Sequence, residues 1–215
     1  MKKIGKVMDK LGKHFDYKER TTLNRMRKKP NAFKILIACL LSLRAKDETT
    51  ERISKELFKV ANTPRKIAKI NTKRLEKIIF STGHYRKKAR VLKHVSSELI
   101  KRFNGKVPSN REDLMSIKGI GPKTANIVLS FAFDKPVIAV DTHVHRVSNR
   151  LGLVKTKTAE KTEPELYKKI PKKYWKETNA LLVLFGREVC QPISPKCSKC
   201  PINKVCKKVN VKKSR

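Results

Sequence analysis

Acidic residues are scarce in this 215-residue chain, which has 18 Asp and Glu against 54 Lys and Arg. An ordinary solvated surface interleaves the two signs more evenly, so a formal net charge of +36 argues against that interpretation. The excess indicates a polyanionic partner, and nucleic acid is the default candidate. A lysine-rich surface of the thermophile type and a membrane-surface protein are the alternatives.

Long apolar runs are missing as well. The longest, residues 35–43, is interrupted by Ser42 and is too short to span a bilayer. The N-terminal segment has Lys6 and Asp9 where a secretory signal would have an apolar core. We therefore expect the chain to remain in the cytoplasm.

Strand-like alternation is also absent. Apolar residues recur three to four positions apart, as at Ile53, Leu57 and Val60, and this spacing predicts helices. Only residues 137–140 resemble a strand, and because they have no hairpin partner we expect an extended connector. Gly and Pro breaks divide the chain into about ten helices with no repeat of fixed period, so the expected fold class is all-α.

Two glycines and a proline interrupt the helical spacing within residues 113–129, which predicts a helix, a tight hairpin and a second helix. Gly121 is expected to cap the second helix, and Pro122 to be its first residue, where its missing N–H costs nothing. Lys123 then occupies the second helical position, where the positive end of the helix dipole disfavours a cation. Because it breaks this local rule beside a glycine hairpin, Lys123 is a functional candidate.

Three interpretations of Lys123 can be compared. It can bind a phosphate together with the free N–H groups of Gly119 and Gly121. It can instead be a nucleophilic amine, since the positive end of a helix favours the unprotonated form that attacks. A nucleotide-binding P-loop is excluded, because that motif requires Gly where this chain has Pro122 and a strand where residues 112–117 are helical. Chemistry alone leaves the first two open.

Asp141 follows an apolar segment and precedes a helical pattern, so its structural interpretation is an N-cap. The N–H groups of a helix start favour the charged form of a capping carboxylate, which stays available to a cation or a proton. Asp141, His143 and His145 superficially suggest a metal site. On a helix, however, His143 is rotated away from the other two, which argues against metal binding by this trio.

Four of the five cysteines gather near the C-terminus as Cys190-x6-Cys197-x2-Cys200-x5-Cys206. An odd total in a chain expected in a reducing compartment favours a metal site over disulfides. Zinc usually takes two C-x2-C pairs, whereas only one pair here has that spacing and is followed by proline, as in ferredoxin-type motifs. The spacing favours a 4Fe-4S cluster, with zinc as the alternative. Cys39 lies on an apolar helix face and is expected in the core.

Three basic places are further candidates for contact with nucleic acid. Arg44 lies where one helix ends and Asp47 is expected to cap the next, and a solvated surface cation is the alternative. His84 begins a basic helix that contains an aromatic residue, where a side chain can stack on a base, and a structural histidine is the alternative. Lys196 and Lys199 add positive charge to the cysteine-rich segment.

The hairpin at residues 117–126, the segment Val140-Asp141-Thr142-His143 and the cysteine spacing together resemble the endonuclease III family. Members of this helix-hairpin-helix family are DNA glycosylases that also act as abasic-site lyases. The resemblance runs from about Ile35 to Cys206, and the three motifs in this order are highly specific.

The resemblance implies an all-α fold of two helical domains in a monomeric protein. A six-helix domain would span residues 24–135 and contain the helix-hairpin-helix at about 113–129. The second domain would combine residues 1–23 with 136–215 and carry a structural 4Fe-4S cluster. Duplex DNA with a damaged base or an abasic site would bind in the cleft between them.

By the family pattern, Lys123 is the amine that attacks C1′ of the damaged nucleotide and expels the base, and Asp141 assists. The resulting Schiff base lets the sugar lose its 3′ phosphate by β-elimination. The backbone N–H groups of Gly119 and Gly121 would hold a phosphate.

A base inside a duplex is unreachable, so such an enzyme must flip it out and fill the gap. Arg44 and His84 fall where the family places its gap-filling residues, although bacterial members often have Gln and Leu there. Lys118 replaces the usual proline before the first hairpin glycine. These departures bear on lesion preference and on reading of the opposite strand.

There are two alternative functions, one within the same superfamily and one from another class. Mismatch-specific glycosylases of the same superfamily lack a lysine at the position of Lys123, so its presence argues against them. A non-catalytic basic nucleic-acid-binding protein has no need of the pair Lys123 and Asp141.

Overall fold

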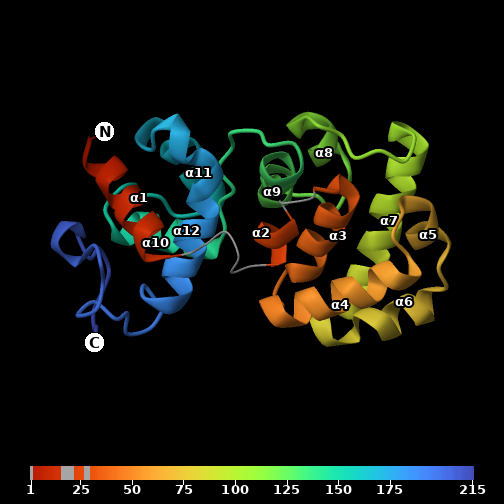
Figure 1. Ribbon diagram of the computed structural model, residues 1–215, viewed down its shortest axis with the longest axis horizontal. Coiled ribbons are helices and arrows are strands. Elements are labelled where there is room, and N and C mark those ends of the chain that lie inside the picture. Colours follow the sequence, from red (N-terminus) through yellow and green to blue (C-terminus); the bar gives the residue numbers. More distant parts are fainter. Residues whose placement is uncertain (1, 16–21, 27–29) are drawn as a thin grey trace. The chain divides into compact units, whose positions relative to one another are not determined.

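The computed structural model describes residues 2–15, 22–26 and 30–215, and the chain divides into two compact units (Figure 1). Unit 1 comprises Met1–Arg20 and Lys135–Arg215, and unit 2 comprises Thr21–Asp134. All regular secondary structure in the described residues is helical, which confirms the expected all-α class. None of the helices described is long and apolar enough to cross a membrane.

Unit 2 is built around one apolar helix. Its elements are α2 (Thr22–Met26), α3 (Ala32–Ser42), α4 (Asp47–Val60), α5 (Pro64–Lys69), α6 (Thr72–Ile79), the 3₁₀ helix η1 (Phe80–Thr82), α7 (Tyr85–Phe103), α8 (Arg111–Ser116) and α9 (Pro122–Ala132). Residues 35–41 of α3 are all buried, because the helix packs against α4, α7 and α9. A helix that is apolar all round has to be covered on every side.

Unit 1 joins the N-terminal helix to the C-terminal part of the chain. Its elements are α1 (Lys2–His14), α10 (Thr142–Arg150), α11 (Ala159–Lys169), the 3₁₀ helix η2 (Lys172–Tyr174), α12 (Trp175–Glu188) and the 3₁₀ helix η3 (Asn203–Val205). Met8 and Leu11 of α1 share a buried cluster with Val147 of α10 and Phe185 of α12. This shared core explains why helices from opposite ends of the sequence belong to one unit.

The described residues form twelve α-helices and three 3₁₀ helices, where about ten helices were expected. Part of the difference arises at the junction of α5 and α6, which has neither Gly nor Pro. Helix α5 has its C-cap at Ile70, and Asn71 caps α6, where its Oδ1 accepts the N–H of Arg74 at 3.2 Å. A single polar side chain is thus enough to divide a helical run.

Residues 135–141 have no regular secondary structure, so the expected extended connector at 137–140 is confirmed. The N–H of Ile138 donates to the hydroxyl of Tyr167 at 2.9 Å, and the amide of Asn179 donates to the carbonyl of Ala139 at 2.9 Å. These bonds from α11 and α12 satisfy the extended backbone within unit 1. The connector leads directly into Asp141 and α10.

Candidate active site and nucleic-acid interface

The hairpin, residues 117–121, connects α8 to α9 and is closed by local hydrogen bonds. The N–H of Ile120 donates to the carbonyl of Ile117 at 3.0 Å. Gly119 has φ +104°, and a Cβ at this position would lie 2.9 Å from Cγ1 of Val91 in α7. Only glycine meets both conditions without strain. Lys118, Gly119 and Gly121 are exposed at the turn.

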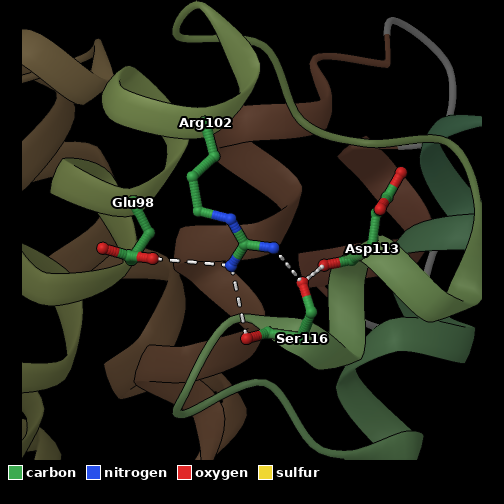
Figure 2. Close-up of polar contacts among 4 residues, drawn as sticks. All are labelled: Glu98, Arg102, Asp113 and Ser116. Atoms are coloured by element: carbon green, nitrogen blue, oxygen red, sulfur yellow. Dashed lines mark hydrogen bonds and ion pairs between the residues drawn. The ribbon is translucent and has the colours of Figure 1, made fainter.

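Arg102 of α7 fixes the end of α8 where the hairpin begins (Figure 2). Its Nη2 donates to Oγ of Ser116 at 2.7 Å, and its Nη1 donates to the Ser116 carbonyl at 3.4 Å. The same guanidinium lies 3.5 Å from Oε2 of Glu98, and Oγ of Ser116 donates to the carbonyl of Asp113 at 2.7 Å. The last carbonyls of a helix have no N–H partner within the helix, and Arg102 supplies donors to this last turn.

Gly121 is the N-cap of α9 and Pro122 is its first residue, which confirms both predictions and places Lys123 second in the helix. Lys123 is half-buried at the contact between α9 and α3. Burial raises the pKa of the Cys39 thiol in α3, and the nearby ammonium of Lys123 and a hydrogen bond with Thr124 oppose that rise. Cys39 is therefore a core residue, as expected, and the amine of Lys123 stands beside the packed core on a rigid helix start.

Asp141 is the N-cap of α10, which confirms the structural part of its interpretation. Its Oδ1 accepts the N–H groups of His143 and Val144, both at 2.9 Å. The side chain is half-buried, and its second oxygen, Oδ2, has no hydrogen-bond partner among the residues described. One oxygen thus holds the carboxylate in place, and the other remains available for a proton or a positive charge.

His143 and His145 have structural partners in unit 1. Nδ1 of His145 lies 2.7 Å from Oγ1 of Thr162, and Nδ1 of His143 lies 3.2 Å from Nη2 of Arg146. These contacts engage Nδ1 of both rings within unit 1.

The four C-terminal cysteines line a single cavity in unit 1: Cys190, Cys197, Cys200 and Cys206. Burial raises the pKa of the Cys200 and Cys206 thiols, and the negative charge of the neighbouring cysteines raises it further. Thiolates that repel one another in this way are stabilised by a shared cationic centre. Four thiolates around one cavity fit a closed structural metal site or an iron–sulfur cluster.

Within the described ranges, no group of three or more His, Cys, Asp or Glu side chains is arranged to hold one metal ion. The four C-terminal thiols nevertheless line one cavity.

Two arginines of α10 hold the start of the cysteine loop, which we define as residues 190–206. Nη2 of Arg146 donates to the carbonyls of Gly186 at 2.8 Å and Cys190 at 3.0 Å. Nη1 of Arg150 donates to the Gln191 carbonyl at 2.5 Å and lies 3.7 Å from Sγ of Cys190. The helix capped by Asp141 therefore also anchors the first cysteine.

Arg44 and His84 are exposed residues of unit 2 with left-handed backbone conformations, at φ +56° and +47° respectively. Arg44 follows α3, and His84 is the N-cap of α7 without a side-chain capping bond. The expected capping role of Asp47 is wrong. Lys46 is the N-cap of α4, and Asp47 is its first residue, where its charge suits the helix dipole.

The structure groups the candidate residues within the two units. Unit 2 holds Lys118, Gly119, Gly121, Lys123, Arg44 and His84, and unit 1 holds Asp141, Lys196, Lys199 and the four cysteines. Lys196 is half-buried and Lys199 is exposed in the cysteine loop.

Sequence reasoning did not single out Arg102, Arg146 or Arg150. The last two are spaced i, i+4, so they share one face of α10 and could have been noticed as a pair. Their carbonyl partners are 40 or more residues away along the chain and left no local signal.

Known protein families and individual proteins are similar to this chain over most of its length. A family model described as HhH-GPD superfamily base excision DNA repair protein matches residues 37–172. A protein named endonuclease III from Thermotoga maritima is 45% identical over 182 residues, which cover 85% of each chain. Endonuclease III from Bacillus subtilis is 36% identical over 208 residues, which cover 96% of this chain and 93% of the other.

Solved structures give the same result. A trapped endonuclease III–DNA covalent intermediate matches with a TM-score of 0.87 and 38% identity, covering 96% of this chain and 95% of the other. A thermostable thymine-DNA glycosylase shares the fold, with a TM-score of 0.83 and 24% identity. From the family model and the extent of these identities, the chain is a member of the endonuclease III family within the HhH-GPD superfamily of base excision DNA repair proteins.

Proposed function

We propose that this base excision repair glycosylase removes oxidised pyrimidines from duplex DNA and then cleaves the abasic strand through a Schiff base on Lys123. The observation that carries the proposal is the position of Lys123, second in α9 and directly behind an exposed glycine hairpin. A phosphate held by hairpin N–H groups would bring a nucleotide to this amine. The two units are then the two domains of a monomer that works on chromosomal DNA in the cytoplasm.

The proposed reaction proceeds in two steps. The unprotonated amine of Lys123 attacks C1′, the glycosidic bond breaks, and the base leaves with the bonding electrons and takes up a proton. The sugar ring then opens as the C1′–O4′ bond breaks, O4′ takes up a proton, and a Schiff base forms between C1′ and Nζ. Removal of a proton from C2′ breaks the C3′–O bond, and the 3′ phosphate departs with that electron pair.

Asp141 would act on the same nucleotide as Lys123. Because Oδ1 accepts two helix N–H groups, the carboxylate is oriented before substrate arrives. Its free oxygen is suited to accept a proton or to stabilise positive charge that develops on the sugar. This is a preorganised group that need not reorient during the reaction.

The remaining candidate residues bind DNA in this account. Lys118 and the N–H groups of Gly119 and Gly121 would hold a phosphate at the hairpin. Arg44 and His84 would fill the gap left by the flipped base. Lys196 and Lys199 would contact the backbone from the cysteine loop.

Cys190, Cys197, Cys200 and Cys206 would hold a 4Fe-4S cluster, which they fit as a set of four thiolates around one cavity. When bound, it would supply a rigid cross-link for the cysteine loop and neutralise the mutual repulsion of the thiolates. Arg146 and Arg150 would orient the same loop by their bonds to its backbone.

A panel of duplexes, each with one defined lesion, tests the proposal. The wild-type enzyme should release oxidised pyrimidines and leave the strand end typical of β-elimination. Lys123→Ala should abolish strand cleavage, whereas Lys118→Ala removes one positive charge from the same hairpin and should retain it. Binding to every duplex without base release or cleavage would refute the proposal.

A further inference from the structure

Lys88 of α7 is a buried cation that the proposed chemistry does not use. The residue is 7% exposed. Its Nζ donates two hydrogen bonds of 2.7 Å, one to the carbonyl of Leu41 and one to the carbonyl of Thr82. Burial lowers the pKa of Lys88 to about 8. Burying an ammonium is costly unless it is hydrogen-bonded, and these two carbonyls supply the bonds.

The two carbonyls lie just before the two loops that carry the candidate gap-filling residues. Leu41 is in the last turn of α3, three residues before Arg44, and Thr82 ends η1, two residues before His84. Helix ends leave such carbonyls without intrahelical partners, and a cation at a helix C-terminus is favoured by the dipole. One ammonium thus binds both loops at their bases.

Both loops also need such support. Arg44 and His84 have positive φ values, which cost free energy for residues other than glycine. Residues in this conformation persist only where the surrounding structure holds them. Both side chains are exposed, so local hydrogen bonds, such as Ala45 N–H to the Ser42 carbonyl and Gly83 N–H to the Phe80 carbonyl, and the bonds from Lys88 hold these conformations.

We propose that Lys88 is a positioning residue that joins the loops of Arg44 and His84, so that the two side chains enter the duplex as one wedge. The inference rests on the proposed function, because a wedge has a use only if a base is flipped out. Opening a paired lesion costs a few kcal/mol, and an abasic site needs no base to be extruded. A displaced wedge should therefore slow the reaction on the paired lesion much more than the reaction on the abasic site.

The test compares rates on a paired lesion and on a preformed abasic site. We define the ratio as the rate on the paired lesion divided by the rate on the abasic site. Lys88→Met should lower this ratio by about tenfold or more, since a factor of ten corresponds to only 1.36 kcal/mol of the cost of flipping. Lys93→Met is the matched control. Lys93 lies on the same helix and donates to one carbonyl, that of Ile70, at 2.6 Å. The Lys93→Met variant should keep the ratio within about twofold of wild type, even if its free energy of unfolding changes.

A double-mutant comparison separates this inference from the function on which it rests. The variant Arg44→Ala with His84→Ala should lower the ratio, and adding Lys88→Met should lower it no further. If the Arg44–His84 variant lowers the ratio but Lys88→Met does not, or if their effects add, the positioning role is overturned. If the Arg44–His84 variant leaves the ratio unchanged, the gap-filling role fails and the positioning role fails with it.

Lys88→Gln keeps N–H donors on a shorter, uncharged side chain and extends the test if the methionine variant does not fold. It should give a ratio between those of wild type and the Arg44–His84 variant. A ratio equal to wild type would overturn the inference.

Discussion

At the scale of single residues, the two hairpin glycines have different physical roles. Gly119 combines φ +104° with a close approach to Val91, whereas Gly121 has φ −92° and open space around its Cβ position. The first position requires glycine, and the second only favours it as a helix cap.

We predict that Gly119→Ala lowers the free energy of unfolding by about 1–3 kcal/mol, because the new methyl group meets both a strained backbone and a side chain of α7. Gly121→Ala should cost no more than about 1 kcal/mol, the value of a lost cap. Denaturant unfolding of the two variants measures this difference. Equal losses would show that the backbone of Gly119 is not held as described.

Asp141 combines a structural and a chemical role, and two substitutions separate them. Asparagine caps a helix as well as aspartate does, so Asp141→Asn should retain the stability of wild type. Its carboxamide cannot accept a proton or balance a positive charge, so base release should slow by about a hundredfold or more. Single-turnover kinetics at saturating enzyme measure the rate.

Asp141→Ala removes the cap as well, and its stability should fall by about 1 kcal/mol in addition to the kinetic defect. If Asp141→Asn released the base at the wild-type rate, the residue would be a helix cap and nothing more.

At the scale of elements, α7 supports the candidate DNA contacts of unit 2. Its first residues follow His84, Lys88 binds the two loops, Val91 lies under the hairpin and Arg102 holds the end of α8. The 19 residues of this helix thus connect the hairpin to the loops of the candidate gap-filling residues Arg44 and His84. Helix α10 has a comparable role in unit 1, between Asp141 and the cysteine loop.

We predict that Arg150→Ala loosens the cysteine loop, because the carbonyls of Gln191 and Pro192 lose their donor. Purified wild-type protein should contain about four iron atoms per chain. In the variant, a chelator should remove this iron faster, as followed by visible absorbance. Lys199→Ala, at an exposed position of the same loop, is the control and should match wild type. Equimolar zinc without iron would contradict the cluster.

Features with local signals could be predicted from the sequence. Gly121 and Pro122 are neighbouring signals for the start of α9, and Asp141 is a capping residue directly before α10. Features that depend on distant contacts could not be predicted. Lys88 is indistinguishable from any other lysine in a basic segment, because its partner Leu41 is 47 residues away along the chain. The break at Asn71 was missed because one polar side chain replaces the usual Gly or Pro.

At the scale of the whole molecule, the net charge of +36 should dominate DNA affinity. Each lysine or arginine that neutralises a phosphate releases counterions, so binding weakens as salt rises. If about six phosphates are contacted, affinity should fall on the order of a thousandfold between about 50 and 200 mM salt. Fluorescence anisotropy with a labelled duplex measures this dependence. A flat response would mean that the excess charge serves another purpose.

Borohydride trapping reports whether Lys123 becomes covalently attached to the damaged nucleotide. Reduction of a Schiff base gives a stable bond, which a phosphate contact cannot give. Borohydride added during reaction with an oxidised-pyrimidine duplex should link protein to DNA, and mass spectrometry of the digested adduct should locate the bond at Lys123. Lys123→Ala should give no adduct while keeping most of its DNA affinity, and Lys118→Ala, which loses one phosphate contact, should still give the adduct at saturating DNA. An adduct that persists in Lys123→Ala, or maps to another amine, would contradict the account.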